Sequence, residues 1–329
     1  MHYYFQLLLN LFLLVVGCIS LVLWLRQLPR FAKAGLLSYA DGLLPAKNRE
    51  RPFWGVSEIF IMFGSFIVAQ QLLLLLAVEK GWFEMPSADV LNKKLTPDAV
   101  FVLQMCTALA NCASIGLLLL WIRNISRDNI RKFGLSLDRS MIVLGLKSAV
   151  MILPPVLVVS GLVSWLVTAY EHQVLNVLEQ LRSPRVFSVI FVGTGIIVPI
   201  AEEILFRGLI QGSLQRLADR FVNGAVQSPY GATETALSTN ELQETHDAGN
   251  QVGTQRAEGE LWAPVAYWPV FAASFVFAVM HIGQGAAPIP LFLLSLGLGY
   301  LYRQTGSLIP CIVVHMILNS TTLLASLLE

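Results

Sequence analysis

Long apolar runs separated by short polar segments dominate this chain. A helix of about 20 apolar residues spans a bilayer and satisfies its own backbone hydrogen bonds there. No alternation typical of strands competes with the helical pattern. The pattern therefore predicts an all-α polytopic membrane bundle with about eight transmembrane helices. The predicted spans are Tyr4–Leu25, Val56–Val78, Val100–Ile122, Met141–Tyr170, a run starting at Val186, Tyr267–Ile282, Ile289–Tyr302 and Leu308–Leu328.

Basic residues are concentrated in the loops that follow the first and third runs, residues 26–51 and 122–140. By the positive-inside rule, this asymmetry predicts cytoplasmic basic loops and an N-terminus on the outside. The first run lacks a basic segment before it and a small-residue cleavage site after it, so we expect a retained helix rather than a signal peptide. Pro29 and two glycines predict that segment 26–51 is a loop or a short interfacial helix. With no organelle signal, the expected location is the plasma membrane.

Residues 221–264 differ from the rest because they are polar and nearly free of long apolar runs. Such a composition predicts a disordered cytoplasmic insertion. We divide the chain into N-terminal transmembrane helices at 1–185, about four spans, and a second part at 186–329 that carries this insertion.

Composition narrows the class of protein. Of 329 residues, 55% are hydrophobic and only 13% are charged, which is typical of a multi-span membrane protein rather than a soluble enzyme. The formal net charge of +1 gives no basic footprint for nucleic acid, so the expected surroundings are a lipid bilayer. All four cysteines lie in apolar runs without metal-binding spacing, and we expect free buried thiols.

The sequence Pro199-Ile-Ala-Glu-Glu-Ile-Leu-Phe-Arg-Gly208 places three charges inside an apolar run. Ionisable residues within a membrane are costly, so they indicate a functional site by default. Glu203 and Arg207 are four residues apart and share a helix face, which predicts a buried structural pair. Glu202 lies about 100° around the helix and has no local cation. It is therefore the carboxylate available for chemistry, with partners from other helices.

Two histidines, His281 and His315, lie in the later apolar runs, whereas the other three lie in terminal or loop sequence. Phe277 and His281 are four residues apart, as are His315 and Asn319, so each pair shares a helix face. A single histidine in a helix is more often structural. Together with Glu202, however, these groups can activate water by general base catalysis and donate hydrogen bonds to an oxyanion. No serine nucleophile elbow or HExxH motif accompanies them.

The three motifs resemble those of the CPBP family, the CAAX protease and bacteriocin-processing membrane proteases, also called the Abi family. That family includes the eukaryotic Ras-converting CAAX endopeptidase. Here the series EExxxR, FxxxH and HxxxN/B reads Glu202-Glu203-Ile-Leu-Phe-Arg207, Phe277-Ala-Val-Met-His281 and His315-Met-Ile-Leu-Asn319. The resemblance covers roughly Val186–Leu328. The polar insertion between the first two motifs is longer than expected for the family.

The resemblance implies an intramembrane endopeptidase acting on membrane-associated proteins or peptides. Glu202 and His281 match the pair that activates water, and His315 and Asn319 match the pair that stabilises the oxyanion. Glu203, Arg207 and Phe277 would support them. We expect no cofactor, with one alternative, in which Glu202, His281 and His315 bind a catalytic zinc ion.

These roles require Glu202 to reach the depth of His281 in the membrane. If the fifth run ended near Glu202, the two residues would be about 20 Å apart at 1.5 Å per residue. We therefore predict one long helix over Val186–Arg220, bent at Pro199.

Two non-protease hypotheses stand beside this reading. A non-catalytic membrane scaffold or immunity protein would be expected to lack a motif residue, and none is missing. A transporter would be expected to carry broken helices in matching places of both halves. Here the ionisable residues gather in the second half alone.

Overall fold

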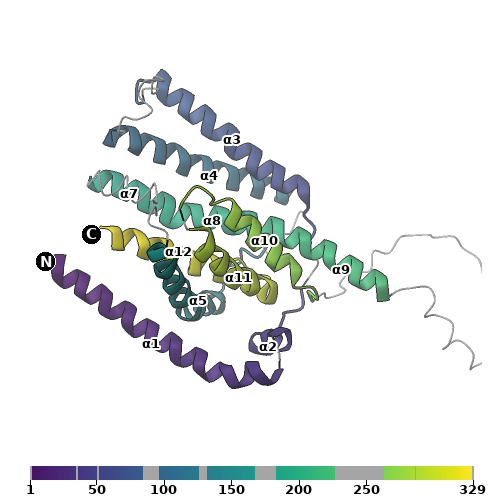
Figure 1. The fold of residues 1–329 in the computed structure, drawn as a ribbon. Coiled ribbons are helices and arrows are strands. Elements are labelled where there is room, and N and C mark those ends of the chain that lie inside the picture. The colour runs from purple at the N-terminus through teal and green to yellow at the C-terminus, as the bar shows by residue number, and fades with distance from the viewer. Residues whose placement is uncertain are drawn as a thin grey trace, which may run out of the picture.

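The computed structural model describes residues 2–34, 36–49, 52–83, 96–125, 132–166, 183–226, 263–285 and 287–327. In these ranges every regular element is a helix, as predicted (Figure 1). In chain order the elements are α1 (His2–Ala34), α2 (Leu36–Leu43), α3 (Val56–Glu79), α4 (Pro97–Ile125), α5 (Arg139–Leu166), α7 (Pro184–Val192), the π-helical η2 (Gly193–Ile197), α8 (Val198–Glu203), the π-helical η3 (Ile204–Gln211), α9 (Gly212–Val226), α10 (Trp268–Val279), α11 (Pro288–Thr305) and α12 (Ile309–Ser326).

Each of the eight predicted apolar runs contains a helix, and within the described ranges six helical segments are long and apolar enough to cross a membrane. Two of the eight fall short of that standard. α10 has 12 residues, and α11 ends on the polar Arg303, Gln304 and Thr305. The chain is therefore an integral membrane protein with an all-helical fold. The six segments are Gln6–Lys33, Val56–Glu79, Pro97–Asn124, Arg139–Leu166, Pro184–Asp219 and Ile309–Ser326.

Several predicted boundaries shift. The first helix continues past Leu25 to Ala34 and contains Pro29, so only α2 corresponds to the short helix expected in segment 26–51. The fourth run is helical to Leu166, and residues 167–182 lie outside the described residues. Of the predicted insertion, residues 221–226 belong to α9, and residues 227–262 lie outside the description.

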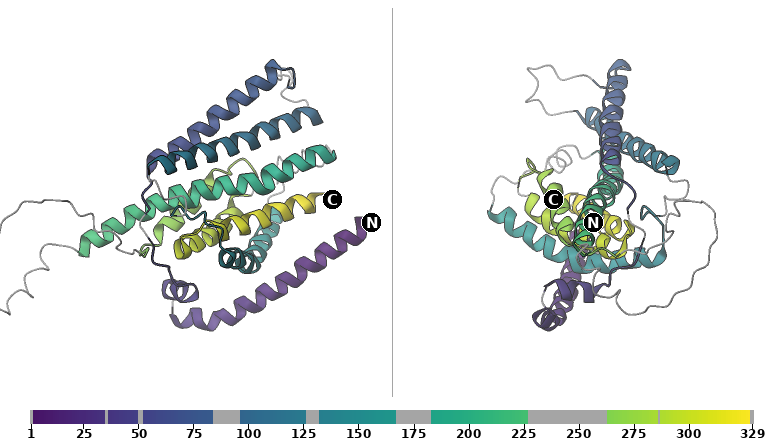
Figure 2. Two further views of the ribbon diagram at one scale, coloured as in Figure 1. Left: turned by 180° about the vertical axis from the view of Figure 1, so that it is seen from behind. Right: turned by 90° about the vertical axis from the view of Figure 1, so that its right-hand side faces the viewer.

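The segments α7 to α9 form one long helix through the middle of the molecule (Figure 1). α3 and α4 pack on one side of it, and α10, α11 and α12 pack on the other. α5 packs against α11 and α12, and α1 lies at the edge beside α5 in both further views (Figure 2). The Trp24 indole of α1 donates a hydrogen bond to the Met151 carbonyl of α5 at 3.0 Å. The long helix therefore contacts most of the bundle and can bring distant side chains together.

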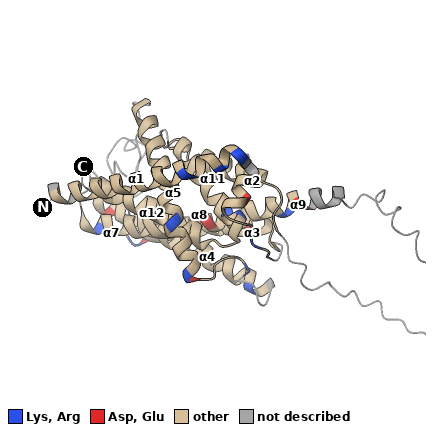
Figure 3. Ribbon diagram, turned by 90° about the horizontal axis from the view of Figure 1, so that it is seen from below, with Lys and Arg blue, Asp and Glu red and all other residues tan. Residues whose placement is uncertain are grey.

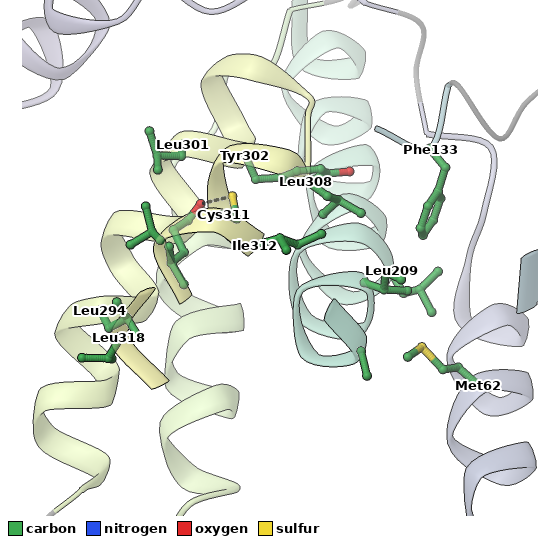
Figure 4. Close-up of a cluster of buried hydrophobic side chains, with 14 of the residues drawn as sticks. Met62, Phe133, Leu209, Leu294, Leu301, Tyr302, Leu308, Cys311, Ile312 and Leu318 are labelled. Atoms are coloured by element: carbon green, nitrogen blue, oxygen red, sulfur yellow. Dashed lines mark hydrogen bonds between the residues drawn. The ribbon is translucent and has the colours of Figure 1, made fainter. Parts of the chain in front are cut away.

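A cluster of buried side chains fills the space between the long helix, α11 and α12 (Figure 4). Leu209, Leu294, Leu298 and Leu308 are fully buried within it. Two cysteines, Cys106 and Cys311, are buried as expected. Cys18 and Cys112 are exposed on the surfaces of α1 and α4, so the expectation that all four are buried was wrong.

Close helix packing at Gly145 of α5 gives a testable prediction. A Cβ at this position would lie 2.8 Å from Val313 Cβ and 3.1 Å from Pro310 Cα on α12. Overpacking of this kind lowers the free energy of unfolding by about 1–3 kcal/mol, so Gly145→Ala should lower the thermal midpoint. Gly161→Ala in the same helix has nothing within 4 Å. This control should change stability by less than about 1 kcal/mol, and equal shifts for the two variants would contradict the packing argument.

Charged residues are sparse along the helices, and an acidic position lies in the mostly uncharged ribbon near α8 (Figure 3). At the α2 end of the molecule, Arg303 of α11 contacts Asp41 of α2 at 3.1 Å and stacks 3.6 Å from the centre of the Tyr267 ring. Burial alone would raise the pKa of Asp41. Hydrogen bonds from Tyr267 and Gln304, with the charge of Arg303, outweigh it and hold that pKa below its usual value. Asp41 is therefore a stable anion that fastens α2 to α11.

Candidate active site

The long helix positions the predicted site. Pro184 to Val226 is helical without a break, which confirms that Glu202 lies within a continuous helix rather than near its end. Pro199 does not interrupt the helix, and the ribbon shows no sharp bend at α8 where we predicted the helix to bend (Figure 1). Instead, two π-helical segments, η2 and η3, flank the short α8 that contains Glu202 and Glu203. π-Helical segments widen the turn, and they recur at functional sites.

Each π-helical segment leaves a backbone carbonyl that accepts a hydrogen bond from a distant side chain. In η2 the Val198 N–H donates to the Gly193 carbonyl, five residues back, so the Thr194 carbonyl loses its usual donor. The next N–H in that register would belong to Pro199, which has none. The Asn319 Nδ2 of α12 donates to the Thr194 carbonyl at 2.9 Å. Pro199 thus shapes the site by leaving an acceptor for Asn319.

The second π-helical segment, η3, leaves a carbonyl that accepts a hydrogen bond from a side chain in the N-terminal half of the chain. The Gly212 N–H donates to the Arg207 and Leu209 carbonyls and passes over that of Gly208. The Trp54 indole donates to the Gly208 carbonyl at 2.6 Å. Trp54 therefore holds the segment before α3 against the helix turn that follows the two glutamates.

Glu203 and Arg207 form the predicted buried pair. Arg207 Nε lies 3.1 Å from Glu203 Oε2, and the two side chains are 1% and 0% exposed. The guanidinium also donates from Nη2 to Ser295 Oγ at 3.0 Å and lies 4.8 Å from the centre of the Phe277 ring. An ion pair buried this deeply is stable only when further contacts satisfy both partners. Ser295 was not among the predicted site residues.

His315 of α12 lies between the two glutamates. Its Nδ1 is 2.7 Å from Glu203 Oε1, and its Nε2 is 3.5 Å from Glu202 Oε2. Because Glu203 faces Arg207, we assign Glu203 as the charged acceptor and Nδ1 of His315 as the donor. In the neutral ring, Nε2 then faces Glu202 as an acceptor. The contact with Glu203 was not predicted, since the spacing of residues along the chain gives no information about packing between α8 and α12.

His281 approaches Glu202 from the other side. It lies in the turn after α10, which ends at Val279, so our expectation of a helical position was wrong. The predicted proximity to Phe277 is confirmed, because the ring centres are 4.7 Å apart and Nδ1 lies 2.8 Å from the Phe277 carbonyl. That carbonyl can only accept, so Nδ1 carries the proton. Nε2 points to Glu202 Oε1 at 3.9 Å and, in the neutral ring, is also an acceptor.

Glu202 therefore meets two imidazole nitrogens that cannot donate to it when both rings are neutral. The Glu202 carboxylate and the two Nε2 atoms are then all acceptors, and each Nε2 lies within 3.9 Å of a carboxylate oxygen. Such an arrangement requires a shared proton or a molecule with several donors, such as water. The Glu202 side chain is 23% exposed and that of His281 is 15% exposed, whereas that of Glu203 is fully buried. The site is therefore open at the carboxylate that we identified as available for chemistry.

The zinc alternative can be compared with this geometry. Within the described part of the chain, no group of three or more His, Cys, Asp or Glu side chains is arranged so that it could hold a metal ion. Histidine ligands of metals are commonly oriented by a carboxylate on the second ring nitrogen. His315 does have such a partner in Glu203. Metal dependence therefore stays a question for experiment.

Comparison with known families finds a match in the second half of the chain. Residues 184–232 and 251–321 match the model of the Rce1-like family, described as type II CAAX prenyl endopeptidase Rce1-like. The C-terminal part of the chain is therefore similar to this family. This match confirms the resemblance drawn from the three motifs. Searches of curated proteins and of solved structures each returned no significant match.

The matched ranges contain every candidate site residue. Glu202, Glu203 and Arg207 lie in its first matched range, and Phe277, His281, His315 and Asn319 lie in its second. The helices α1 to α5 lie outside both ranges. Because the matched family is one of endopeptidases, the match supports a protease at the family level.

Proposed function

We propose that this protein is an intramembrane endopeptidase that hydrolyses peptide bonds of membrane-associated proteins or peptides. The observation that carries the proposal is the convergence of Glu202 with Nε2 of His281 and of His315, at 3.9 and 3.5 Å. A water molecule about 2.8 Å from Glu202 and from either ring nitrogen fits these separations. Such a water would donate to the carboxylate and be held for attack.

In the proposed reaction, Glu202 accepts a proton from the water, and the water oxygen attacks the carbonyl carbon of the scissile bond. His281 holds the water through Nε2. The tetrahedral intermediate then collapses, and the proton on Glu202 passes to the leaving amine. One water is consumed, and one carboxylic acid and one amine are formed. General base catalysis of this type contributes about 10²–10⁴-fold to the rate.

We assign stabilisation of the oxyanion to Asn319 and His315. One Nδ2 proton of Asn319 is used on the Thr194 carbonyl, and the second is available to a substrate oxygen. His315 can donate from Nε2 only when that nitrogen carries a proton in addition to the one on Nδ1. Glu202 Oε2, once it has taken the proton from water, can share that proton with His315 Nε2 while the oxyanion exists, before the proton passes to the leaving amine. Donors held in place before reaction are the main source of such stabilisation.

Cleavage in the presence of a chelator separates the two mechanisms. Purified full-length protein would be incubated with a panel of membrane-tethered peptides, prenylated and unprenylated, with and without a strong chelator. We expect cleavage that persists in chelator. Loss in chelator with recovery on added zinc would establish Glu202, His281 and His315 as metal ligands. If no peptide in the panel is cleaved, a non-catalytic scaffold becomes the better hypothesis.

A further inference from the structure

A stripe of buried polar side chains runs from the candidate active site along the long helix. Its members are four residues apart, and each is at most 2% exposed. A rise of 1.5 Å per residue places successive members about 6 Å apart along the helix axis, so the stripe extends over about 24 Å. The stripe comprises Glu203, Arg207, Gln211, Gln215 and Asp219.

Helix α11 faces the stripe with a matching series, Ser295, Gly299 and Arg303, also four residues apart. Gln211 Nε2 donates to the Gly299 carbonyl at 2.8 Å, one turn beyond the contact between Arg207 and Ser295. Because Gly299 has no side chain, the amide of Gln211 can lie against the α11 backbone. Its Oε1 is only 2.9 Å from where a Cβ on Gly299 would sit.

Helix α10 closes the third side. Val270 Cγ1 approaches the same Cβ position at 2.9 Å, and Phe277 lies beneath the Arg207 guanidinium. Ser274 is four residues after Val270 and three before Phe277, so it shares their face and lies between the levels of Gln211 and Arg207. Ser274 is 1% exposed. A hydroxyl is therefore enclosed between three helices beside the stripe.

Five buried polar atoms of the stripe and of Ser274 make no hydrogen bond to any described residue, although Glu203 Oε2 has its ion contact with Arg207 Nε: Glu203 Oε2, Arg207 Nη1, Gln211 Oε1, Gln215 Oε1 and Ser274 Oγ. Buried polar groups are nearly always satisfied by protein or by ordered water. A buried water typically makes about three hydrogen bonds to such groups. Five atoms without a hydrogen bond, four on the long helix and one on α10, thus point to a polar ligand that can donate and accept.

We propose that the polar stripe, with Ser274 and Ser295, binds a file of ordered water molecules that leads to the two glutamates. One water bridging two polar atoms spans about 5.6 Å, which matches the spacing of about 6 Å along the helix. The inference rests on the proposed function, because the water delivered is the water that hydrolysis consumes.

The far end of the stripe lies one buried residue, Arg303, away from an exposed side chain. Gln215 Nε2 and Arg303 Nε both donate to the Ala266 carbonyl, at 3.0 and 3.2 Å. Arg303 also contacts Asp41, whose side chain is 52% exposed. The water file therefore runs from the α2 end of the molecule to a reaction site surrounded by apolar helices.

Accessibility of two engineered thiols tests the file without relying on catalysis. Ser274→Cys would place a thiol in the file, and Ala273→Cys would place one at the adjacent, equally buried position. Full-length protein would be exposed to Ag⁺, then denatured and alkylated, and protection at each thiol would be measured by mass spectrometry. Because thiol reactivity follows contact with water, we expect Ag⁺ to protect the thiol of Ser274→Cys at least about tenfold faster than that of Ala273→Cys. Equal rates for the two thiols would overturn the proposal.

A second variant measures the effect on turnover. Gln211→Leu removes both polar atoms of the side chain at similar volume. We expect kcat to fall about tenfold with unchanged KM, and the thermal midpoint to be equal or higher. Gln70→Leu, which removes another unpaired amide oxygen in α3, is the matched control and should leave kcat unchanged. A lower thermal midpoint with normal kcat would make Gln211 merely structural. If the wild type cleaves nothing, the proposed function fails while the thiol comparison still decides on the water file.

Discussion

Glu202→Gln is expected to lower kcat/KM for peptide cleavage by about 10³-fold, within the range of general base catalysis. The amide has nearly the shape of the carboxylate but cannot take a proton from water. It can also donate to Nε2 of His281 or His315, both of which lie within 3.9 Å as acceptors. The variant should therefore fold normally. Its amide would compete with the attacking water for the ring nitrogens of His281 and His315.

Cleavage rates and thermal midpoints of purified variants would be measured together. Glu79→Gln, at the exposed end of α3, removes a carboxylate far from the site and should retain full activity. If Glu202→Gln kept activity within about threefold of the wild type, the base would have to be another group. An equal loss in both variants would indicate a general effect of charge instead.

The second large effect is expected on stability. Arg207→Met would leave Glu203 fully buried without its cation, and breaking a buried pair on one side costs about 3–5 kcal/mol. The thermal midpoint in detergent should therefore fall markedly. His315 would remain as the hydrogen-bond partner of Glu203, which limits the loss but does not replace the charge.

Two further variants isolate the buried charge as the cause. Arg185→Met breaks the exposed pair with Asp98, which lies at 3.7 Å, and should cost less than about 1 kcal/mol. The double variant Glu203→Gln with Arg207→Met removes both charges and should be more stable than Arg207→Met alone. Similar midpoints for Arg207→Met and Arg185→Met would show that the burial of charge has little effect here.

Much of the fold was predictable because helix formation in a membrane depends on local sequence. Apolar length gave the helices, and the four-residue spacing gave the Glu203–Arg207 and Phe277–His281 contacts, which the structure confirms. The same spacing continues from Arg207 to Gln211, Gln215 and Asp219. The spacing of the buried stripe is thus present in the sequence and extends beyond the motif that ends at Arg207.

Contacts between helices could not be predicted in this way. The bond from His315 to Glu203 depends on how α12 packs against α8, and that from Asn319 to Thr194 depends on the register of η2. A π-helical segment has no simple residue signature, so the carbonyls that it leaves for other donors are visible only in three dimensions. The roles assigned to the four site residues stay predictions until the variants are measured.

The contact of Trp54 with the Gly208 carbonyl also bears on where this protein can be divided. Trp54 and Asp41 lie outside the matched ranges, yet they hold a turn of the long helix and Arg303 inside them. A fragment beginning at residue 184 would lose both contacts and would expose the side of the long helix that α3 and α4 cover. The ranges that are similar to the family are therefore shorter than the unit of folding, which extends back to at least α2.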